Sequence, residues 1–436
     1  MNSNLLKKIL VLSCGIFILS MVSRFIEKNN PASCSDACLS YSSIIPTASN
    51  TPEKTLSNTS PVGFVVLHGK KVSLRGNTQQ LKYFYEALAK ARQKRMRVAH
   101  WGDSIIMGDV ISEYLRDNLQ KQFGGDGAGF VSIKTDEIRS TTRASSSGDW
   151  QESSLFTRNS NKLPLGINGA VFQPSEGSWV KYEVGRFNNH LRVFSYAKLF
   201  YANVPSGGYV TCTFSNNTSQ TFRFESGKSL KKIDISFPSG CSSVTMTFKS
   251  CSGGYFYGVS FENGEGVYVD NLPIRGNSGV GLAEIPLNVL KEFNSYMNYK
   301  FLIINFGVNV VSSQYSNYSW YESQMSKVVD YLQQAFPQAS ILLISVGDKG
   351  VKKGSKFVTD PGIPLLLRSQ ETIANQKGIG YWNMFEAMGG ANIISDWVDE
   401  TPALAFKDYT HLTTSGGKII ADLLTDALLE EMKKSH

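Results

Sequence analysis

The sequence predicts an α/β protein whose parallel sheet, with helices on both faces, is interrupted by an all-β region. Three observations predict this architecture. Apolar runs at residues 301–306 and 340–345 are each followed by a helix-like segment, and a similar run at residues 97–101 precedes another. Between them, residues 179–263 alternate in short strand-like runs. Helical periodicity returns at residue 283.

The α/β segments are defined by their apolar strands and by the helices expected between them. The run Phe-Leu-Ile-Ile-Asn at residues 301–305 has the apolar character of a strand that is buried on both faces of a parallel sheet. The helix expected after the first strand is amphipathic. The expected helices cover residues 111–123, 283–296, 321–336, 365–377 and 415–433.

The intervening region consists of short alternating runs that are separated by Gly, Ser and Asn. Alternation with a period of two is typical of strands with one buried face, and regular turns between such runs indicate an antiparallel sandwich. The expected strands cover residues 179–184, 191–196, 209–214, 221–224, 232–237, 244–248 and 255–261. We therefore expect an all-β sandwich domain inserted into the α/β domain.

The first 60 residues differ in composition from the rest of the chain. Lys7 and Lys8 precede an apolar run at residues 9–22, and no small-x-small cleavage site follows it. We expect an uncleaved signal anchor at residues 1–26, with a cleaved signal peptide as the alternative. Residues 27–60 are rich in Ser, Asn, Pro and Thr without periodicity, which predicts a flexible linker. Both alternatives export the folded part to the bacterial periplasm or cell surface, and the anchor would tether it to the inner membrane.

The length of 436 residues suggests two or three domains, and a hydrophobic fraction of 42% is sufficient for their cores. We place the first part of the α/β domain at residues 61–164, the inserted sandwich at residues 165–270, and the second part of the α/β domain at residues 271–436. The sandwich resembles a carbohydrate-binding module in its architecture only, because no sugar-binding motif is recognisable in it.

Composition also limits the partners. The net charge of +8 favours anionic surroundings such as cell-wall polymers or lipid headgroups. Nucleic acid is not expected as a partner, because the basic residues are scattered and no nucleic-acid-binding motif appears. We expect no cofactor and no metal, since the chain lacks Cys-x-x-Cys pairs with metal spacing, a phosphate-binding loop and a dinucleotide-binding fingerprint.

The cysteines allow disulfides in an oxidising compartment. Cys34 and Cys38 are close enough in sequence to close a small loop. Two of the three cysteines Cys212, Cys241 and Cys251 could pair within the all-β region, which leaves one thiol over.

The tripeptide Gly102-Asp103-Ser104 follows the first apolar strand directly, where a sharp strand-to-helix turn is expected. Such a turn lifts a serine hydroxyl off the sheet edge, so that substrate reaches it and backbone N–H groups face a developing oxyanion. This arrangement is typical of a hydrolase nucleophile.

Two histidines are candidates for the base that activates this serine. His411 lies three residues after Asp408, a spacing that lets a carboxylate reach one ring nitrogen and leaves the other free for the serine. His100 lies on the alternating strand beside the turn, which directs its side chain away from that of Ser104. We therefore favour His411.

Four spaced blocks resemble those of the SGNH, or GDSL-type, hydrolase superfamily. They are Gly102-Asp103-Ser104, Gly276 in Arg-Gly-Asn-Ser-Gly, Gly307-Val-Asn309 and Asp408-x-x-His411, and they occur in the order of the family over residues 95–430. The resemblance implies a flavodoxin-like three-layer sandwich. It also implies that Ser104 attacks an ester carbonyl, that His411 is the base and that Asp408 orients it. The oxyanion would be held by the N–H groups of Ser104 and Gly276 and by the side-chain amide of Asn309.

Two positions in these blocks need separate consideration, namely the glycine of the second block and the residue after the block asparagine. Gly169 in Leu-Gly-Ile-Asn-Gly-Ala is an alternative for the second block, but Gly276 is preferred because it follows the all-β region and precedes a helix-like run. Many members of the family have an acidic residue after the block asparagine, whereas this chain has Val310.

An SGNH domain with an inserted sandwich resembles the two-domain bacterial peptidoglycan O-acetylesterases and related polysaccharide O-acetyl enzymes. The resemblance implies an exported serine esterase that removes O-acetyl groups from a cell-wall glycan through an acetyl-serine intermediate. The first alternative is an O-acetyltransferase that adds acetyl groups to peptidoglycan or an exopolysaccharide beside a membrane-bound acyl exporter. The second alternative is a non-catalytic glycan-binding protein. For the esterase, the expected partner is an acetylated glycan substrate, and for the transferase it is the membrane-bound acyl exporter.

Overall fold

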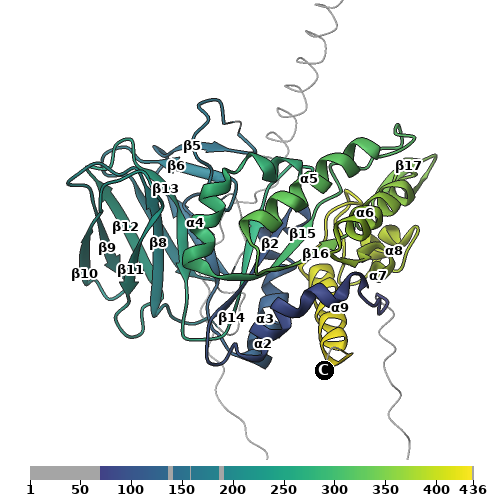
Figure 1. Cartoon of the computed structure of the whole chain (residues 1–436), viewed down its shortest axis with the longest axis horizontal. Helices are drawn as coiled ribbons and strands as arrows, with labels where there is room; N and C mark the ends of the chain where they lie inside the picture. The colour runs from purple at the N-terminus through teal and green to yellow at the C-terminus, as the bar shows by residue number, and fades with distance from the viewer. Residues whose placement is uncertain (1–68, 136–140, 158, 186–190, 435–436) are drawn as a thin grey trace, which may run out of the picture. The chain divides into compact units, whose positions relative to one another are not determined.

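A computed structural model of the chain describes residues 69–135, 141–157, 159–185 and 191–434 (Figure 1). They all belong to the larger of two structural units, Val65–His436. The predicted signal segment, the predicted linker and the predicted Cys34–Cys38 pair lie outside the described residues, so these predictions stay predictions. In the described ranges, no helix is both long enough and apolar enough to cross a membrane.

The parallel sheet of the α/β domain has six strands in the order β1-β19-β16-β15-β2-β14. All neighbours are parallel except the edge strand β1, which pairs with β19 in the antiparallel direction. All seven residues of β2 are buried, as expected of a central strand with helices on both faces. The strands are β1 (Arg75–Gly76), β2 (Met96–Gly102), β14 (Val267–Pro273), β15 (Tyr299–Asn305), β16 (Ser340–Ile344) and β19 (Gly380–Trp382).

Helices cover both faces of this sheet. The chain runs from β14 to β15, β16 and β19 in one direction, so right-handed crossovers place α4, α5 and α6 on one face. The connection from β2 to β14 runs in the opposite direction and places α3 on the other face, where α3 packs against α9 (Figure 1). The helices are α2 (Lys82–Ala89), α3 (Ser112–Phe123), α4 (Leu287–Met297), α5 (Ser319–Ala335), α6 (Ile363–Lys377), α7 (Met384–Met388), α8 (Ile393–Asp399) and α9 (Thr414–Lys434), with 3-10 segments η1 (Thr78–Leu81), η2 (Ser104–Asp109) and η3 (Val280–Glu284).

The all-β region forms two antiparallel sheets that enclose a second core rich in phenylalanine. One sheet has the order β10-β9-β12-β7-β4, and the other has the order β11-β8-β13-β6-β5 with β3 also paired to β13. The strands are β3 (Gly129–Ser132), β4 (Thr142–Ser146), β5 (Gln151–Ser154), β6 (Ala170–Gln173), β7 (Trp179–Val184), β8 (Tyr196–Ala202), β9 (Tyr209–Phe214), β10 (Ser219–Arg223), β11 (Lys231–Ser236), β12 (Ser243–Lys249) and β13 (Tyr255–Phe261). The predicted fold class, a three-layer α/β domain with an added sandwich, is confirmed.

Strand pairing differs from the predicted domain boundaries at both ends of the insert. The strands β3, β4 and β5 belong to the sandwich sheets although they precede residue 165. The strand β14 belongs to the parallel sheet although it begins at Val267. The early strands escaped prediction because sequences such as Gln-Glu-Ser-Ser in β5 contain no apolar alternation.

Three further expectations need correction. Residues 191–195 do not form a strand, and β8 begins only at Tyr196. The helix expected at residues 283–296 is divided into η3 and α4 by Pro286, whose extended backbone precedes the first residue of α4. The cysteines Cys212, Cys241 and Cys251 are all buried free thiols, so the predicted disulfide within the sandwich is wrong.

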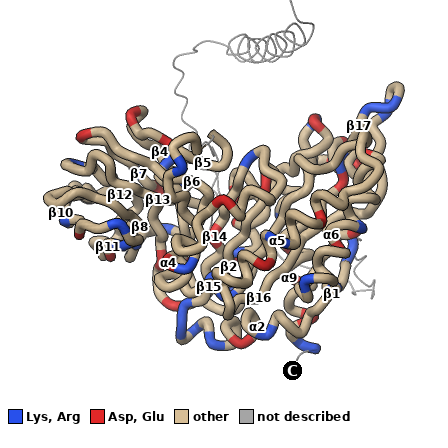
Figure 2. Tube along the Cα trace, turned by 45° about the horizontal axis from the view of Figure 1, so that its top comes forward, with Lys and Arg blue, Asp and Glu red and all other residues tan. Residues whose placement is uncertain are grey.

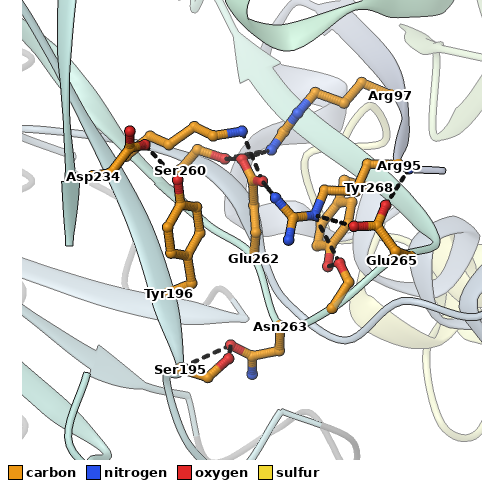
Figure 3. Close-up of polar contacts among 12 residues, drawn as sticks. Arg95, Arg97, Ser195, Tyr196, Asp234, Ser260, Glu262, Asn263, Glu265 and Tyr268 are labelled. Carbon is orange, nitrogen blue, oxygen red and sulfur yellow. Dashed lines mark hydrogen bonds and ion pairs between the residues drawn. The ribbon is translucent and has the colours of Figure 1, made fainter. Parts of the chain in front are cut away.

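A network of buried ion pairs joins the sandwich to the parallel sheet (Figure 3). Arg97 on β2 contacts Asp270 on the neighbouring strand at 2.8 Å and also pairs with Glu262, which follows β13 of the sandwich. Lys198 on β8 contacts Glu262 at 2.9 Å, and the Tyr299 hydroxyl donates to Asp270 at 2.5 Å. These contacts connect three strands of the parallel sheet with β8 of the sandwich and with the residue that follows β13.

The two ionised groups at the centre of this network stabilise each other. Burial alone would favour the neutral form of Glu262, but the positive charges of Arg97 and Lys198 outweigh it and lower the pKa of Glu262 to about 2. Burial likewise opposes the charge on Arg97, and the carboxylates of Asp270 and Glu262 outweigh it, so the pKa of Arg97 is raised. Both groups are therefore ionised in the folded protein throughout the neutral range.

Candidate active site

The nucleophile candidate lies where β2 ends at the carboxyl edge of the parallel sheet. Ser104 is the first residue of η2 and is partly exposed, whereas its neighbours Asp103 and Ile105 are buried. The turn requires a glycine before Asp103, because a Cβ on Gly102 would lie 2.8 Å from the carbonyl oxygen of Asn305. The sequence therefore presents one hydroxyl at the surface of a closely packed turn.

Ser104 is aligned with His411 and Asp408. The Ser104 Oγ lies 2.7 Å from the His411 Nε2, and the His411 Nδ1 lies 2.7 Å from the Asp408 Oδ2. The side chain of His411 is 38% exposed and that of Asp408 is 49% exposed, so solvent reaches both. The structure thus brings the three predicted catalytic side chains into one chain of hydrogen bonds, with His411 between the hydroxyl and the carboxylate.

The loop before α9 holds Asp408 in place. Asp408 Oδ1 accepts the N–H groups of Thr410 and His411 at 3.0 Å each, and Tyr409 between them has a φ of 54°. Partial burial favours the neutral acid, but these hydrogen bonds and the bond to the His411 ring outweigh it and lower the pKa of Asp408. The pair is therefore arranged by a tight loop before α9.

Asp103, for which the sequence suggested no separate role, connects the Ser104 turn to the loop that carries Asn309. One carboxylate oxygen accepts the N–H of Ile105 at 3.0 Å, and the other accepts those of Gly307 at 2.9 Å and Val308 at 3.2 Å. Burial raises the pKa of Asp103 to about 6 even though these N–H groups favour the charged form. A buried carboxylate thus fixes two loops of the site relative to each other.

The predicted oxyanion-hole residues Asn309 and Gly276 lie on neighbouring loops. Asn309 is exposed just after β15, and its side-chain amide donates to the backbone carbonyl of Asn277 at 3.3 Å. Gly276 directly precedes Asn277 in the loop after β14 and has a φ of 70°. The structure therefore joins the loops of Gly276 and Asn309 by a hydrogen bond.

The alternative glycine, Gly169, lies in a different environment. Its N–H donates to the carbonyl of Gly166 at 2.8 Å, within the turn that leads into β6 of the sandwich. An N–H that is already used in a turn cannot also stabilise an oxyanion, so the geometry favours Gly276 as the block glycine.

The other histidine considered as the base, His100, is fully buried on β2. Its Nδ1 lies 2.8 Å from the hydroxyl of Ser112 in α3, away from Ser104. Burial lowers the pKa of His100 to about 4. His100 therefore belongs to the packing between β2 and α3, as the alternation of the strand indicated.

A cavity of about 160 Å³ is lined by residues of both the α/β domain and the sandwich, but not by Ser104, His411 or Asn309 themselves. Its lining includes Met107 of η2, Glu152 of β5, and Arg275, the residue before Gly276. Phe156 also lines it, is 55% exposed, and lies under the guanidinium of Arg275 at 5.7 Å from the ring centroid. An exposed ring beside polar groups suits the apolar face and the hydroxyls of a sugar.

Within the described part of the chain, no group of three or more His, Cys, Asp or Glu side chains is placed to hold a metal ion. The site is thus composed of the Ser104 hydroxyl, the His411 imidazole, the Asp408 carboxylate and amide donors on adjacent loops. Chemically, this set can activate a hydroxyl for attack on a carbonyl and can face a developing oxyanion.

Comparison with known proteins identifies a solved structure that has the same fold. No protein-family model and no curated protein sequence matches the chain. A solved structure described as "Peptidoglycan O-acetylesterase in action, 5 min" superposes with a TM-score of 0.67 and 18% identity, over 83% of this chain and 99% of the other. The chain has the fold of that esterase. The superposition covers nearly the whole of the other protein, so the sandwich and the α/β domain are both shared.

Two further structures match over smaller parts or with less agreement. A family two carbohydrate esterase from Cellvibrio japonicus matches 67% of this chain and 98% of its own, at 9% identity and a TM-score of 0.28. A putative GDSL-like lipase from Parabacteroides merdae matches 37% of this chain and 72% of its own, at 19% identity and a TM-score of 0.28.

Proposed function

We propose that this chain is an exported serine esterase that removes O-acetyl groups from a cell-wall glycan, with peptidoglycan as the first candidate. The observation that carries the proposal is the hydrogen-bonded chain Ser104–His411–Asp408, with 2.7 Å at each link, at the carboxyl edge of the sheet. Fixed hydrogen bonds on both sides of an imidazole are the arrangement that a general base needs in order to activate a serine.

The proposed reaction proceeds in two halves. In the first, Ser104 Oγ attacks the acetyl carbonyl carbon while His411 Nε2 takes the hydroxyl proton. The oxyanion that forms faces the N–H groups of Ser104 and Gly276 and the amide of Asn309. The intermediate collapses to acetyl-serine, and His411 gives its proton to the departing sugar oxygen.

In the second half, water attacks the acetyl-serine. His411 takes a proton from the water as the new C–O bond forms, and it returns a proton to Ser104 Oγ when acetate leaves. Asp408 keeps its charge throughout and stabilises the imidazolium form of His411. The hydrogen bonds that lower the pKa of Asp408 keep it ionised for this role.

Three features support a glycan as the substrate. The fold is shared with a peptidoglycan O-acetylesterase. The cavity lined by both domains combines the exposed ring of Phe156 with the polar groups of Arg275 and Glu152. The net charge of +8 suits an anionic polymer such as peptidoglycan.

Water is the proposed acceptor, because His411 and Asp408 are both open to solvent. A transferase would use the same acetyl-serine and a sugar hydroxyl in place of water, and would take its acetyl group from a membrane-bound exporter. The apolar run at residues 9–22 after Lys7 and Lys8 supports export and an inner-membrane anchor, which would place the site in the periplasm or at the cell surface.

The test is acetate release from O-acetylated peptidoglycan by the full-length chain, with and without added unacetylated glycan, beside hydrolysis of 4-nitrophenyl acetate. The expected result is acetate release that depends on Ser104 and is unaffected by the glycan acceptor. Transfer of acetyl groups to the added glycan in preference to water would make the protein a transferase. Binding of peptidoglycan without release or transfer of acetyl groups from either substrate would make it a binding protein.

A further inference from the structure

A two-stranded hairpin rises from the carboxyl edge of the parallel sheet, between β16 and α6. Its strands β17 (Gly350–Lys353) and β18 (Lys356–Thr359) pair in the antiparallel direction, with Gly350 opposite Thr359. The nucleophile turn after β2 lies at this same edge, because β2, β15 and β16 are parallel neighbours. The hairpin is therefore an addition to the sheet on the side where the site is built.

The base of the hairpin contacts two loops of the site. The N–H of Gly350 donates to the carbonyl of Tyr409 at 2.8 Å, and the ring of Phe357 stacks on that of Tyr409 with centroids 3.6 Å apart. Tyr409 lies directly after Asp408. On the other side, the Lys349 Nζ donates to the carbonyl of Val308, next to Asn309, at 3.2 Å. The hairpin is thus held against both the Asp408 loop and the Asn309 loop.

The tip of the hairpin is positively charged. Lys352, Lys353 and Lys356 are exposed, and within the described ranges no carboxylate pairs with them. Figure 2 shows Lys and Arg positions, in blue, at the end of the hairpin that contains β17. No acidic residue occurs between Asp348 and Asp360, and both of these are buried. Asp348 accepts from Thr359 and from the N–H of Ile394, and Asp360 accepts from the N–H of Gly362, so neither reaches the tip.

The Asp408 loop, which the hairpin base contacts, also carries an exposed lysine. Lys407, directly before Asp408, is exposed, and Phe406 before it is 55% exposed. Exposed lysines therefore occur both on the loop that carries Asp408 and at the tip of the hairpin that contacts this loop. Cations that lack a partner in the protein are available to a ligand.

We propose that this hairpin is a substrate-binding arm that recognises the carboxylates of an acidic glycan polymer. The inference rests on the proposed function and deepens it, because it assigns the substrate to the acidic class and not to neutral acetylated polysaccharides such as xylan. Lys352, Lys353 and Lys356 contact carboxylates of the polymer away from the ester, while the hairpin base keeps its Lys349 and Phe357 contacts with the site. Polymer binding is then coupled to placement of the ester at Ser104.

An anionic membrane surface is the other polyanion to consider, and the structure favours the glycan. The tip sequence Lys-Lys-Gly-Ser-Lys carries no apolar side chain that would enter a bilayer. The hairpin base is anchored on the two loops next to the nucleophile, which is where a bound polymer would have to lie in order to react.

The experiment compares two triple variants of the full-length chain. In the first, Lys352, Lys353 and Lys356 are each replaced by Gln. In the control, three exposed lysines elsewhere, Lys228, Lys249 and Lys291, are replaced by Gln.

Binding to O-acetylated peptidoglycan sacculi is measured by sedimentation in a Ser104→Ala background, so that acetyl groups are not consumed. The sacculi are used untreated and after their carboxyl groups have been amidated with a carbodiimide. Vesicles of phosphatidylglycerol form a third arm, and kcat and KM for 4-nitrophenyl acetate are measured with Ser104 present.

The expected result is binding to untreated sacculi that is weakened about tenfold by the hairpin variant, since exposed ion pairs each contribute modestly. The control variant should bind untreated sacculi as tightly as the parent chain does. The parent chain, the hairpin variant and the control should all bind amidated sacculi equally. Binding to sacculi should also weaken with added salt. The kinetics with 4-nitrophenyl acetate should stay unchanged, because that ester has no carboxylate and the hairpin base is intact.

Three outcomes would overturn the proposal. Equal binding of the hairpin variant and the control to untreated sacculi shows that the lysines do not contact the polymer. Loss of vesicle binding alone assigns the hairpin to the membrane. Absence of sacculus binding by the parent chain excludes an acidic glycan altogether. If the hairpin lysines control binding but the parent chain releases no acetate from sacculi, the arm stands and the esterase function is the part that fails.

Discussion

The two ends of β2 both carry buried charge, and they use it in opposite ways. At the amino end, Arg97 is 1% exposed and is surrounded by Asp270, Glu262 and Ser260, all within hydrogen-bonding distance. At the carboxyl end, Asp103 is fully buried and accepts only backbone N–H groups. The next residue there, Ser104, is left partly exposed with His411 as its partner.

The contrast is clearest in two carboxylates. Neighbouring cations lower the pKa of Glu262 to about 2, whereas burial raises the pKa of Asp103 to about 6 because the backbone N–H groups and His411 do not outweigh it. Charge at the amino end is neutralised and joins two domains. Charge at the carboxyl end holds two loops in place and leaves the reactive hydroxyl open. Charged groups at the amino end of β2 are therefore fully ion-paired and hold the fold together. The polar groups at its carboxyl end are not ion-paired, and the candidate nucleophile lies there.

The largest effect expected from this comparison is at Ser104. Ser104→Ala should lower kcat for 4-nitrophenyl acetate by about 10⁴-fold or more, because no other atom can form the acyl intermediate. Thermal unfolding should be unchanged, since the hydroxyl is not part of the core. The matched control is Ser112→Ala, which removes the hydroxyl next to His100 and should retain turnover. Retention of more than a few per cent of activity by Ser104→Ala would remove it from the nucleophile role.

The second effect separates the two histidines. His411→Ala should lower kcat by orders of magnitude with little change in KM, because proton transfer occurs only in the transition state. Asp408→Asn should lower kcat less, since it removes orientation and charge but leaves the base. His100→Ala should lower the melting temperature and leave the kcat of the folded enzyme near that of the parent. An active His411→Ala enzyme beside an inactive, folded His100→Ala enzyme would reverse the assignment.

The third effect is on stability at the amino end. Arg97→Met should lower the free energy of unfolding by about 3–5 kcal/mol, because Asp270 and Glu262 would stay buried without the guanidinium that both contact, and Lys198 and Arg95 would remain only beside Glu262. The control is Arg95→Met, whose side chain is 32% exposed and also contacts Glu262, and which should cost about 1 kcal/mol or less. Urea unfolding measures both. Equal losses in the two variants would show that burial of the pair is not what matters.

The pH dependence of this third effect follows from Glu262. Its folded pKa of about 2 lies below the ordinary value of 4.5, so its stabilising contribution is complete above about pH 4.5 and is lost as the pH falls toward 2. The difference between Arg97→Met and the parent should therefore be constant near neutral pH and shrink in acid.

The smallest effect is the opposite pH dependence expected from Asp103. Its folded pKa of about 6 lies above the ordinary value of 3.8, so the folded state binds the proton more tightly, and this contribution is lost as the pH rises through 6. Between pH 4 and pH 7, the parent should lose about 2–3 kcal/mol more stability than Asp103→Asn, which has no proton to lose. Urea unfolding at the two pH values tests this. An identical pH dependence of stability in both proteins would show that the pKa of Asp103 is not raised.

The sequence was sufficient where the signal is local. The strands β2, β15 and β16 are recognisable as unbroken apolar runs, and the Ser104 turn and the Asp408–His411 pair are recognisable by their spacing. The structure brings these three side chains together, and their catalytic roles remain predictions. The alternation of β2 also correctly separated His100 from the site.

The sequence was insufficient where the decisive contacts are distant along the chain. Arg97 and Glu262 are separated by 165 positions, and a lone arginine in a strand gives no sign of its partners. The early sandwich strands β4 and β5 are short and polar, so pairing and not composition defines them. The free state of Cys212, Cys241 and Cys251 depends on their positions in the folded sandwich. Nothing in the sequence relates the lysines at residues 349–356 to the site, whereas the stacking of Phe357 on Tyr409 does.

If the proposed reaction is correct, Ser104 carries the acetyl group during turnover, and the acetylated protein can be trapped. The full-length chain would be mixed rapidly with 4-nitrophenyl acetate, quenched in acid, digested and analysed by mass spectrometry. The expected result is one acetylated peptide, with the acetyl group on Ser104, that disappears as the substrate is exhausted and is absent from Ser104→Ala. Acetylation of another residue at a rate that matches turnover, or turnover without any acetylated peptide, would contradict it.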